Sequence, residues 1–122
     1  MKFSEDNPAD GFFIQKYDDE TIIINDRGFD SSLIICPDKV IEHWPPRSIE
    51  ALTLQHFDAL LALQPEVALI GTGSRLVFPD VAVYSSLIQQ GIGVEIMDTG
   101  AACRTYNILM GEGRRVVAGL IF

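Results

Sequence analysis

The sequence predicts an α/β fold in which a β-rich N-terminal half is joined to a half of alternating helices and strands. Two observations support this prediction. Short apolar stretches separated by turn residues fill the first part, and amphipathic and apolar segments alternate after Pro45-Pro46. The 122 residues correspond to about one domain. We therefore expect residues 1–122 to form a single domain, with residues 1–10 as a flexible N-terminus.

The N-terminal half contains four stretches that are typical of short strands, because they are rich in β-branched and aromatic residues. The turn residues between them include Asn25–Gly28 and Pro37-Asp38, and Gly28 is free to take a positive φ. Connections this short favour an antiparallel meander. The four stretches are Phe12–Tyr17, Thr21–Ile24, Leu33–Cys36 and Val40–Trp44.

Three amphipathic helices are expected in the C-terminal half. Thr53 is a candidate N-cap for the first helix, which Pro65 ends. Asp80 is a candidate cap for the second helix, and Asp98 or Thr99 for the third. The expected inward faces are Leu54, Phe57, Leu60 and Leu61 in the first helix, Val81, Tyr84, Leu87 and Ile88 in the second, and Ala102, Tyr106 and Leu109 in the third.

Three expected strands follow these helices, one after each. They are Val67–Ile70, Ile92–Met97 and Val116–Ile121. Val67–Ile70 is a continuous apolar run, which is typical of a strand that is buried on both faces. The alternation of such strands with helices predicts a mainly parallel sheet covered by helices.

Charge and hydropathy exclude several classes of protein. Nine basic and seventeen acidic residues give a net charge of −8, which is the wrong sign for unaided binding to nucleic acid. The longest apolar run, Val116–Phe122, is too short to span a membrane, and the first residues lack the apolar core of a signal peptide. We therefore expect a cytoplasmic protein that binds no nucleic acid and has no membrane span.

The sequence shows no pattern for metal binding, a disulfide or a catalytic nucleophile. Cys36 and Cys103 are far apart, and His43 and His56 add no cluster with the close spacing of a zinc site. A Gly-X-Ser-X-Gly motif is absent. We therefore expect no metal, no cofactor and no catalytic residue. Cys103 is open to two interpretations: a thiolate favoured by the neighbouring Arg104, or a small apolar residue on the inner face of its helix.

The most suggestive local motif is Gly71-Thr72-Gly73, which follows a buried strand. Open α/β sheets bind ligands beyond the C-terminal ends of their strands, and a Gly-X-Gly turn lets a phosphate approach the backbone. Asp98, after the next strand, stands where a ribose-binding carboxylate would. However, Leu76 replaces the third glycine of the dinucleotide fingerprint, and residues 74–79 delay the next helix. A tight strand exit built from small residues is the competing interpretation.

Three further polar residues belong to the candidate site. Arg75 and Arg114 are among the four arginines that carry all the positive charge of residues 62–122, and arginine favours bidentate contacts with small anions. Asn107 is a poor helix former inside the third helix, so we expect its amide to tie a nearby loop, such as Gly71–Gly73, or to contact a ligand. The complete candidate ligand or partner site is Gly71, Thr72, Gly73, Arg75, Asp98, Thr99, Asn107 and Arg114.

Two segments also resemble a known family. The first is Val67–Gly73, and the second is Gly91–Thr99 with the Ala102-Cys103, Tyr106-Asn107 and Glu112–Arg114 that follow it. Together they resemble the small Mth-type domain family of uncharacterised bacterial and archaeal proteins. Its members include mitochondrial NADH dehydrogenase (complex I) assembly factor 3 and the adipogenesis-associated Mth domain-containing protein.

This resemblance implies a three-layer α/β fold, in which helices and an additional β layer from the N-terminal strands cover a mixed central sheet. It also implies that the last strand is antiparallel to its neighbours. It supplies no catalytic residues. For the assembly factor it implies a non-enzymatic role in complex I assembly that works through protein contacts.

Two functional hypotheses follow. The first is a non-enzymatic interaction protein of assembly-factor type, with a protein partner such as a complex I subunit or another assembly factor. The second is a domain that binds a nucleotide or another small anionic ligand, and could be an enzyme, through the loops after Ile70 and Met97. A concave site that joins Gly73, Arg75, Asp98 and Asn107 would favour the second hypothesis, and a filled, flat region the first.

Overall fold

The computed structural model describes residues 10–122, so residues 1–9 of the expected flexible N-terminus lie outside the described part. Within this described part, eight strands and three α-helices, with three short 3-10 helices, form the fold. The strands are β1 (Ile14–Tyr17), β2 (Ile22–Ile24), β3 (Arg27–Phe29), β4 (Leu33–Cys36), β5 (Lys39–Ile41), β6 (Val67–Thr72), β7 (Gly93–Met97) and β8 (Val116–Ile121). The helices are α1 (Asp58–Ala62), α2 (Ser85–Gln89) and α3 (Thr99–Gly111), and the 3-10 helices are η1 (Ile49–Ala51), η2 (Leu54–Phe57) and η3 (Val81–Tyr84).

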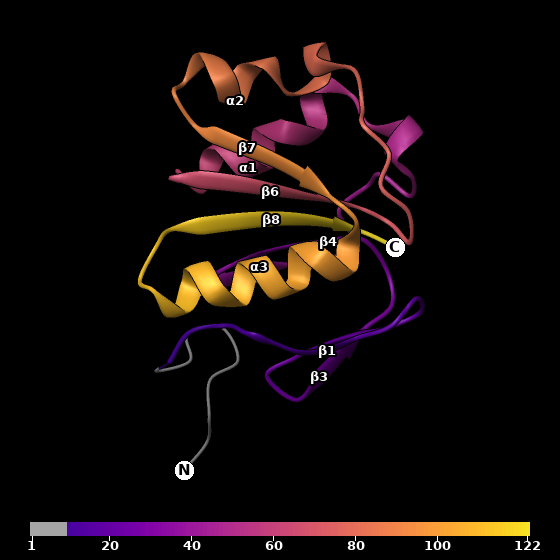
Figure 1. Ribbon diagram of the computed structural model, residues 1–122, viewed down its shortest axis with the longest axis vertical. Coiled ribbons are helices and arrows are strands. Elements are labelled where there is room, and N and C mark those ends of the chain that lie inside the picture. The colour runs from indigo at the N-terminus through magenta and orange to yellow at the C-terminus, as the bar shows by residue number, and fades with distance from the viewer. Residues whose placement is uncertain (1–9) are drawn as a thin grey trace.

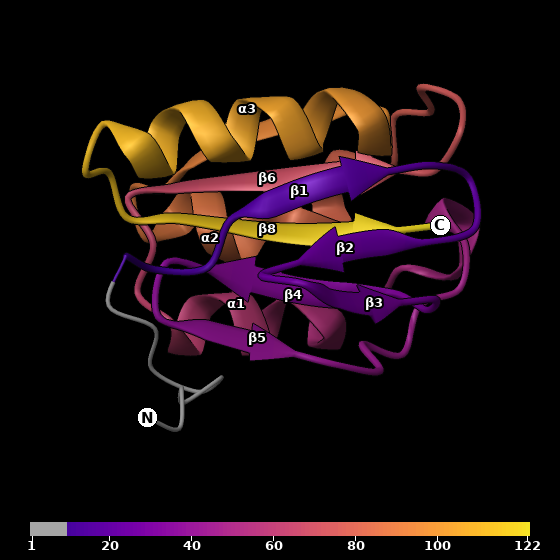
Figure 2. The same cartoon turned by 90° about the horizontal axis from the view of Figure 1, so that it is seen from below.

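These elements form three layers around a five-stranded mixed sheet of order β5-β4-β8-β6-β7. Figure 1 shows α1 and α2 on one face of this sheet, and α3 with the three-stranded sheet β1-β2-β3 on the other. The expected three-layer α/β fold with an additional β layer is therefore confirmed. In Figure 2 the small sheet is seen beside α3, with β1 as the strand that runs along the helix.

The N-terminal strands pair differently from the expected meander. Only β1, β2 and β3 form the antiparallel small sheet, whereas β4 and β5 join the central sheet, where Leu33 of β4 pairs with Leu120 of β8. Asn25 and Asp26, with φ of 45° and 71°, make a two-residue hairpin turn by themselves. The expected four-residue turn is therefore wrong, because Arg27 and Gly28 already belong to β3 and Gly28 has no positive φ.

The last strand corrects a second expectation. β8 is antiparallel to β4 but parallel to β6, so only one of its two neighbours runs in the opposite direction. The reason is the crossover: α3 carries the chain from β7 back across the sheet, and a strand that returns through a helical crossover is parallel to the strand it left. The parallel β7-β6-β8 set agrees with the predicted alternation of helices and strands.

Two of the expected helical faces are only partly buried. In the first, Phe57 and Leu60 are buried but Leu54 is exposed, and in the second Val81 and Ile88 are exposed. The cause is local geometry, because both segments begin as 3-10 helices, whose period of three residues per turn rotates the apolar face. The third helix is as expected, with Ala102 and Tyr106 fully buried and Leu109 packed against the core.

The central sheet separates two hydrophobic cores. One lies beneath α3 and the small sheet, and the other beneath α1 and α2. In the second core Trp44 is buried, and its Nε1 donates a hydrogen bond to the backbone carbonyl of His56 at 3.0 Å. The Trp44 ring lies directly over Gly119 of β8, where an added Cβ would be 2.7 Å from Cη2 and Cζ3 of the ring.

We expect Gly119→Ala to destabilise the protein by about 2 kcal/mol, because the tryptophan ring must move out of a close-packed core. Gly93→Ala is the matched control, since a Cβ on this edge-strand glycine meets nothing closer than 4.0 Å. Urea unfolding measures both free energies. Equal stabilities for the two variants would contradict the packing of Trp44 on β8.

Candidate functional site

The Gly71-Thr72-Gly73 turn is closed by Thr99, the first residue of α3. The Thr99 hydroxyl accepts a hydrogen bond from the backbone N–H of Gly73 at 2.8 Å and donates one to the carbonyl of Ile121 at 2.5 Å. The backbone N–H of Thr99 donates in turn to the carbonyl of Gly73 at 2.9 Å. Thr99 is fully buried, so one side chain joins the ends of β6 and β8 to the start of α3.

Both glycines of the motif are required by this closure. A Cβ on Gly71 would be 2.8 Å from the Thr99 hydroxyl and 3.0 Å from its Cα, so any side chain would displace the helix. Gly73 has a φ of +105°, a conformation that L-residues rarely adopt. The Thr72 hydroxyl donates to the carbonyl of Arg75 at 2.6 Å and accepts from Val77 N–H at 3.3 Å. A phosphate would need the Gly73 amide, which Thr99 already uses.

The remaining candidate residues are spread over the fold. Asp98 is the N-cap of α3 and accepts a hydrogen bond from Ala101 N–H at 2.9 Å. Arg75 is exposed on the loop after β6. Arg114 lies at the other end of α3, where its Nε is 3.9 Å from an Oε2 of Glu66. The structure therefore brings together Gly71, Gly73 and Thr99, and places Asp98 next to them along the chain.

Asn107 ties two elements together, but not the ones expected. Its Oδ1 accepts from Ile14 N–H at 2.9 Å and its Nδ2 donates to the Ile14 carbonyl at 2.6 Å. The amide thus pairs with the edge of β1 as a neighbouring strand would, and not with the Gly71–Gly73 turn. Tyr106, the preceding residue of α3, makes a similar contact: its buried hydroxyl donates to the Phe12 carbonyl at 2.7 Å. These bonds hold the small sheet against α3.

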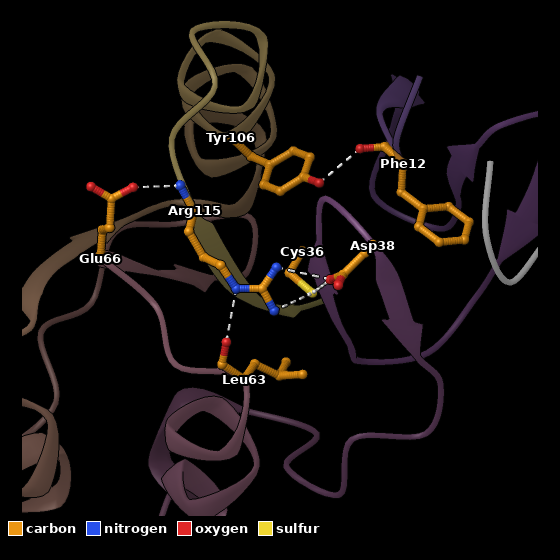
Figure 3. Close-up of polar contacts among 7 residues, drawn as sticks. All are labelled: Phe12, Cys36, Asp38, Leu63, Glu66, Tyr106 and Arg115. Atoms are coloured by element: carbon orange, nitrogen blue, oxygen red, sulfur yellow. Dashed lines mark hydrogen bonds and ion pairs between the residues drawn. The ribbon is translucent and has the colours of Figure 1, made fainter. Parts of the chain in front are cut away.

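A second polar cluster surrounds Arg115, a residue outside the candidate site that the sequence predicts (Figure 3). Its guanidinium donates to the Leu63 carbonyl and to Asp38 Oδ1, both at 3.0 Å, and its backbone N–H donates to Glu66 Oε1 at 2.7 Å. The Cys36 thiol donates to the same Asp38 oxygen at 3.2 Å. The cluster joins the β4–β5 turn to the segment after α1 and to the start of β8. These residues are far apart in sequence, so no local pattern could have revealed the cluster.

Neither cysteine is suited to nucleophilic chemistry. Burial raises the pKa of Cys103 to about 12, which outweighs the opposing effect of Arg104. Burial also raises the pKa of the Cys36 thiol, which is fully buried. Cys103 is therefore a thiol at neutral pH, in agreement with the interpretation as a small apolar residue. Within residues 10–122 we find no group of three His, Cys, Asp or Glu side chains placed to hold a metal ion.

Comparison with known proteins identifies the family. Residues 14–121 match the model of a family described as a protein of unknown function, DUF498/DUF598. The chain belongs to this family. The solution structure of a Bordetella pertussis protein, described as a Mth938-like domain, superposes with a TM-score of 0.80 at 33% identity, over 99% of this chain and 92% of that one. The expected resemblance to the Mth-type domain family is therefore confirmed.

Two relatives of similar sequence identity carry different functional names, one an assembly factor and the other a membrane protein. The chain is 32% identical to human NADH dehydrogenase (ubiquinone) 1 alpha subcomplex assembly factor 3 over 115 residues, which are 93% of this chain and 62% of that protein. It is 30% identical over 117 residues, 95% of both chains, to a Francisella tularensis protein named 13 kDa major membrane protein. In residues 10–122 of this chain, every helix is too short or too polar to cross a bilayer. The cytoplasmic location stays a prediction.

We expect Thr99→Val to destabilise the protein by about 3 kcal/mol, because the Gly73 N–H and the Ile121 carbonyl would be buried without partners. Thr99→Ser keeps the hydroxyl and removes one methyl group, so its cost should be about 1 kcal/mol. Thermal and urea unfolding of the two variants measure the difference. A serine variant as unstable as the valine variant would show that the hydroxyl does not close the turn.

The Asp38 cluster predicts a pH dependence. The Cys36 thiol and the Arg115 guanidinium lower the pKa of Asp38 below its ordinary 3.8. A carboxyl with a lowered folded-state pKa stabilises the fold above its unfolded-state pKa and loses that effect as the pH falls through the folded-state value. Wild type should therefore be more stable than Asp38→Asn at pH 7, and this advantage should shrink below a pH of about 4. Urea unfolding across this range checks it, and an equal advantage at about pH 3 would contradict it.

Proposed function

We propose that this protein acts through contacts with another protein, in the manner of an assembly factor, and that it carries out no reaction of its own. The name of the human relative, an assembly factor for NADH dehydrogenase, supports a partner that belongs to this respiratory complex or to its assembly. The chain spans less than two thirds of that relative, so the proposal concerns the part that the two proteins share.

The single observation that carries the proposal is an exposed apolar segment directly after the Gly71–Gly73 turn. Leu76, Phe78 and Val81 are 52%, 69% and 56% exposed, within a stretch of only six residues. Large apolar side chains that gather on a surface mark protein interaction sites, whereas single ones are common on any protein. We call these three residues the apolar loop.

Hydrogen bonds at Thr72 and Gly73, directly before the apolar loop, hold the loop in place. The Thr72 hydroxyl bonds the backbone at Arg75 and Val77, and Thr99 fixes Gly73, so the chain leaves the sheet in a defined direction. Val77 alternates with the exposed residues and packs against the core beneath α1 and α2. A surface segment that is ordered before binding loses less conformational entropy when a partner covers it.

The surroundings of the apolar loop extend the same surface. The 3-10 helix η3 packs against α2 and η2, and each of these neighbours exposes one more large apolar residue, Ile88 and Leu54. Arg75 stands exposed at the start of the loop, which favours an acidic residue on the rim of the partner's apolar surface. The proposed partner is therefore a protein with an apolar patch and an acidic edge.

The ligand-binding alternative would use a concave site that joins Gly73, Arg75, Asp98 and Asn107. A hollow beside α3 has Asn107 in its wall, but Gly73, Arg75 and Asp98 do not line it. The Gly73 amide, which a phosphate would need, is bonded to Thr99. Both observations support a structural role for the Gly71–Gly73 turn and a partner-binding role for the apolar loop.

We also propose that the protein works in the cytoplasm. Cys36 and Cys103 are both free and buried thiols, which suits a reducing compartment. Fractionation of the native cell tests this directly. Recovery of the protein in the soluble cytoplasmic fraction is expected, and recovery with washed membranes would contradict it.

The functional test is deletion of the gene in a host that has complex I. Assembled NADH:quinone oxidoreductase should fall, with the transcripts of its subunits unchanged, and the wild-type gene should restore it. The double variant Leu76→Ser, Phe78→Ser should fail to restore assembly although it folds, because it removes the apolar contact. Ile108→Ser is the matched control, since Ile108 is equally exposed but lies on α3, on the opposite face of the sheet.

Normal levels of assembled complex in the deletion strain would contradict the assembly role. Full complementation by the double variant would contradict the apolar loop as the contact surface, while leaving the assembly role intact. Failure of Ile108→Ser as well would place the contact on both faces of the molecule.

A further inference from the structure

A hollow with a volume of about 280 Å³ lies between β1 and α3, and no residue of the apolar loop lines it. Figure 2 shows the two elements that form its walls side by side. Lys16 and Tyr17 line it from β1, and Gly100, Cys103 and Arg104 line it from the first turns of α3. We call it the β1–α3 hollow.

Two local features open this hollow. The first is Gly100: a Cβ there would come within 3.3 Å of the Tyr17 ring, so the glycine lets the ring of β1 pack directly on the N-terminal end of α3 and form one side of the hollow. The second is a β-bulge between Ile14 and Lys16, which interrupts the pairing of β1 with β2. A bulge re-aims side chains, and here both Gln15 and Lys16 are exposed in succession.

Two exposed cations line the hollow. Lys16 and Arg104 are exposed and line it from opposite walls, and neither makes an ion pair with a residue of the described chain, 10–122. Asp18, Asp19 and Asp98 lie near Tyr17 and offset part of this charge. Asp98 accepts the N–H of Ala101, and Asp18 accepts the N–H groups of Glu20 and Thr21 in the β1–β2 turn.

The floor of the hollow supplies a neutral donor and an apolar surface. Burial, and after it the nearby acid Asp19, raise the pKa of Tyr17, so its hydroxyl stays protonated and able to donate a hydrogen bond. Cys103 is a protonated thiol and almost fully buried. Both polar atoms of the Asn107 amide are hydrogen-bonded to the backbone of Ile14. Asn107 therefore holds α3 and β1 together and does not contact a ligand.

We propose that the β1–α3 hollow binds a small organic oxyanion, a carboxylate or a phosphate monoester, held between Lys16 and Arg104 with its carbon part over Gly100 and Cys103. Arginine binds planar and tetrahedral oxyanions through paired N–H donors, and lysine adds a compact charge. The volume matches a ligand of a few carbon atoms and is smaller than most drug-sized sites. None of these residues touches the apolar loop, so binding here is independent of the proposed partner contact.

The test is a titration of the isotope-labelled protein with glycerol 3-phosphate and, separately, with succinate, at constant ionic strength. The backbone amide signals of Tyr17, Gly100 and Arg104 should shift in a saturable manner with at least one of the two probes. Saturation by only one probe would identify the phosphate or the carboxylate as the preferred group. Circular dichroism should show that all variants used are folded, because the exposed side chains substituted contribute little to stability.

Arg104→Gln and Lys16→Gln should each weaken binding by about fivefold or more, because each removes one of two facing charges. Arg75→Gln is the matched control, since it removes an exposed arginine that does not line the hollow and should leave the affinity unchanged. Shifts that do not saturate with either probe, or an equal loss of affinity in Arg75→Gln, would overturn the proposal and indicate general attraction of anions to basic side chains.

Discussion

The hydroxyl of Thr99 is the contact on which the rest of the structure depends most. It is fully buried, accepts from Gly73 and donates to Ile121, so it fixes where β6 and β8 end and where α3 begins. These segments are far apart in the chain, and a buried hydroxyl is stable only when its donor and acceptor capacity is used. Because Thr99 occupies the space next to Gly71, that position must be a glycine. The motif that most resembles a phosphate-binding turn is therefore explained by packing and hydrogen bonding within the fold.

The two outer layers of the fold expose different kinds of surface. On one side the chain leaves the Gly71–Gly73 turn as an ordered segment with exposed apolar side chains, which suits contact with a protein. On the other side the amide of Asn107 bonds the edge of β1 and holds the small sheet on α3, and beside it lies a hollow lined by the two cations Lys16 and Arg104. The thiols are buried and protonated, and in the described residues the polar clusters around Thr99 and Arg115 join elements of the fold.

The sequence was sufficient for the architecture but not for its local exceptions. Continuous apolar runs such as Val67–Ile70 identify buried strands, and the caps at Asp80 and Asp98 are correctly placed. The pairing of β4 with β8 was missed because partner choice depends on contacts between residues about 85 positions apart. Exposure of Leu54, Val81 and Ile88 was missed because 3-10 and α-helical turns look alike in a short apolar pattern. The role of Thr99 in closing the glycine turn, and the cluster around Arg115, follow from tertiary contacts that no local pattern contains.

Hydrogen exchange at the backbone amide of Gly73 tests the central claim most directly, because that amide is the donor that either Thr99 or a phosphate would use. If the Thr99 hydroxyl closes the turn, the Gly73 amide should exchange only through global unfolding, with protection equal to that of the central strands β6 and β8. Protection at that level in the free protein is the result the account predicts. Fast exchange at Gly73, at the rate of a solvent-exposed loop, would contradict it and return the turn to consideration as an open ligand site.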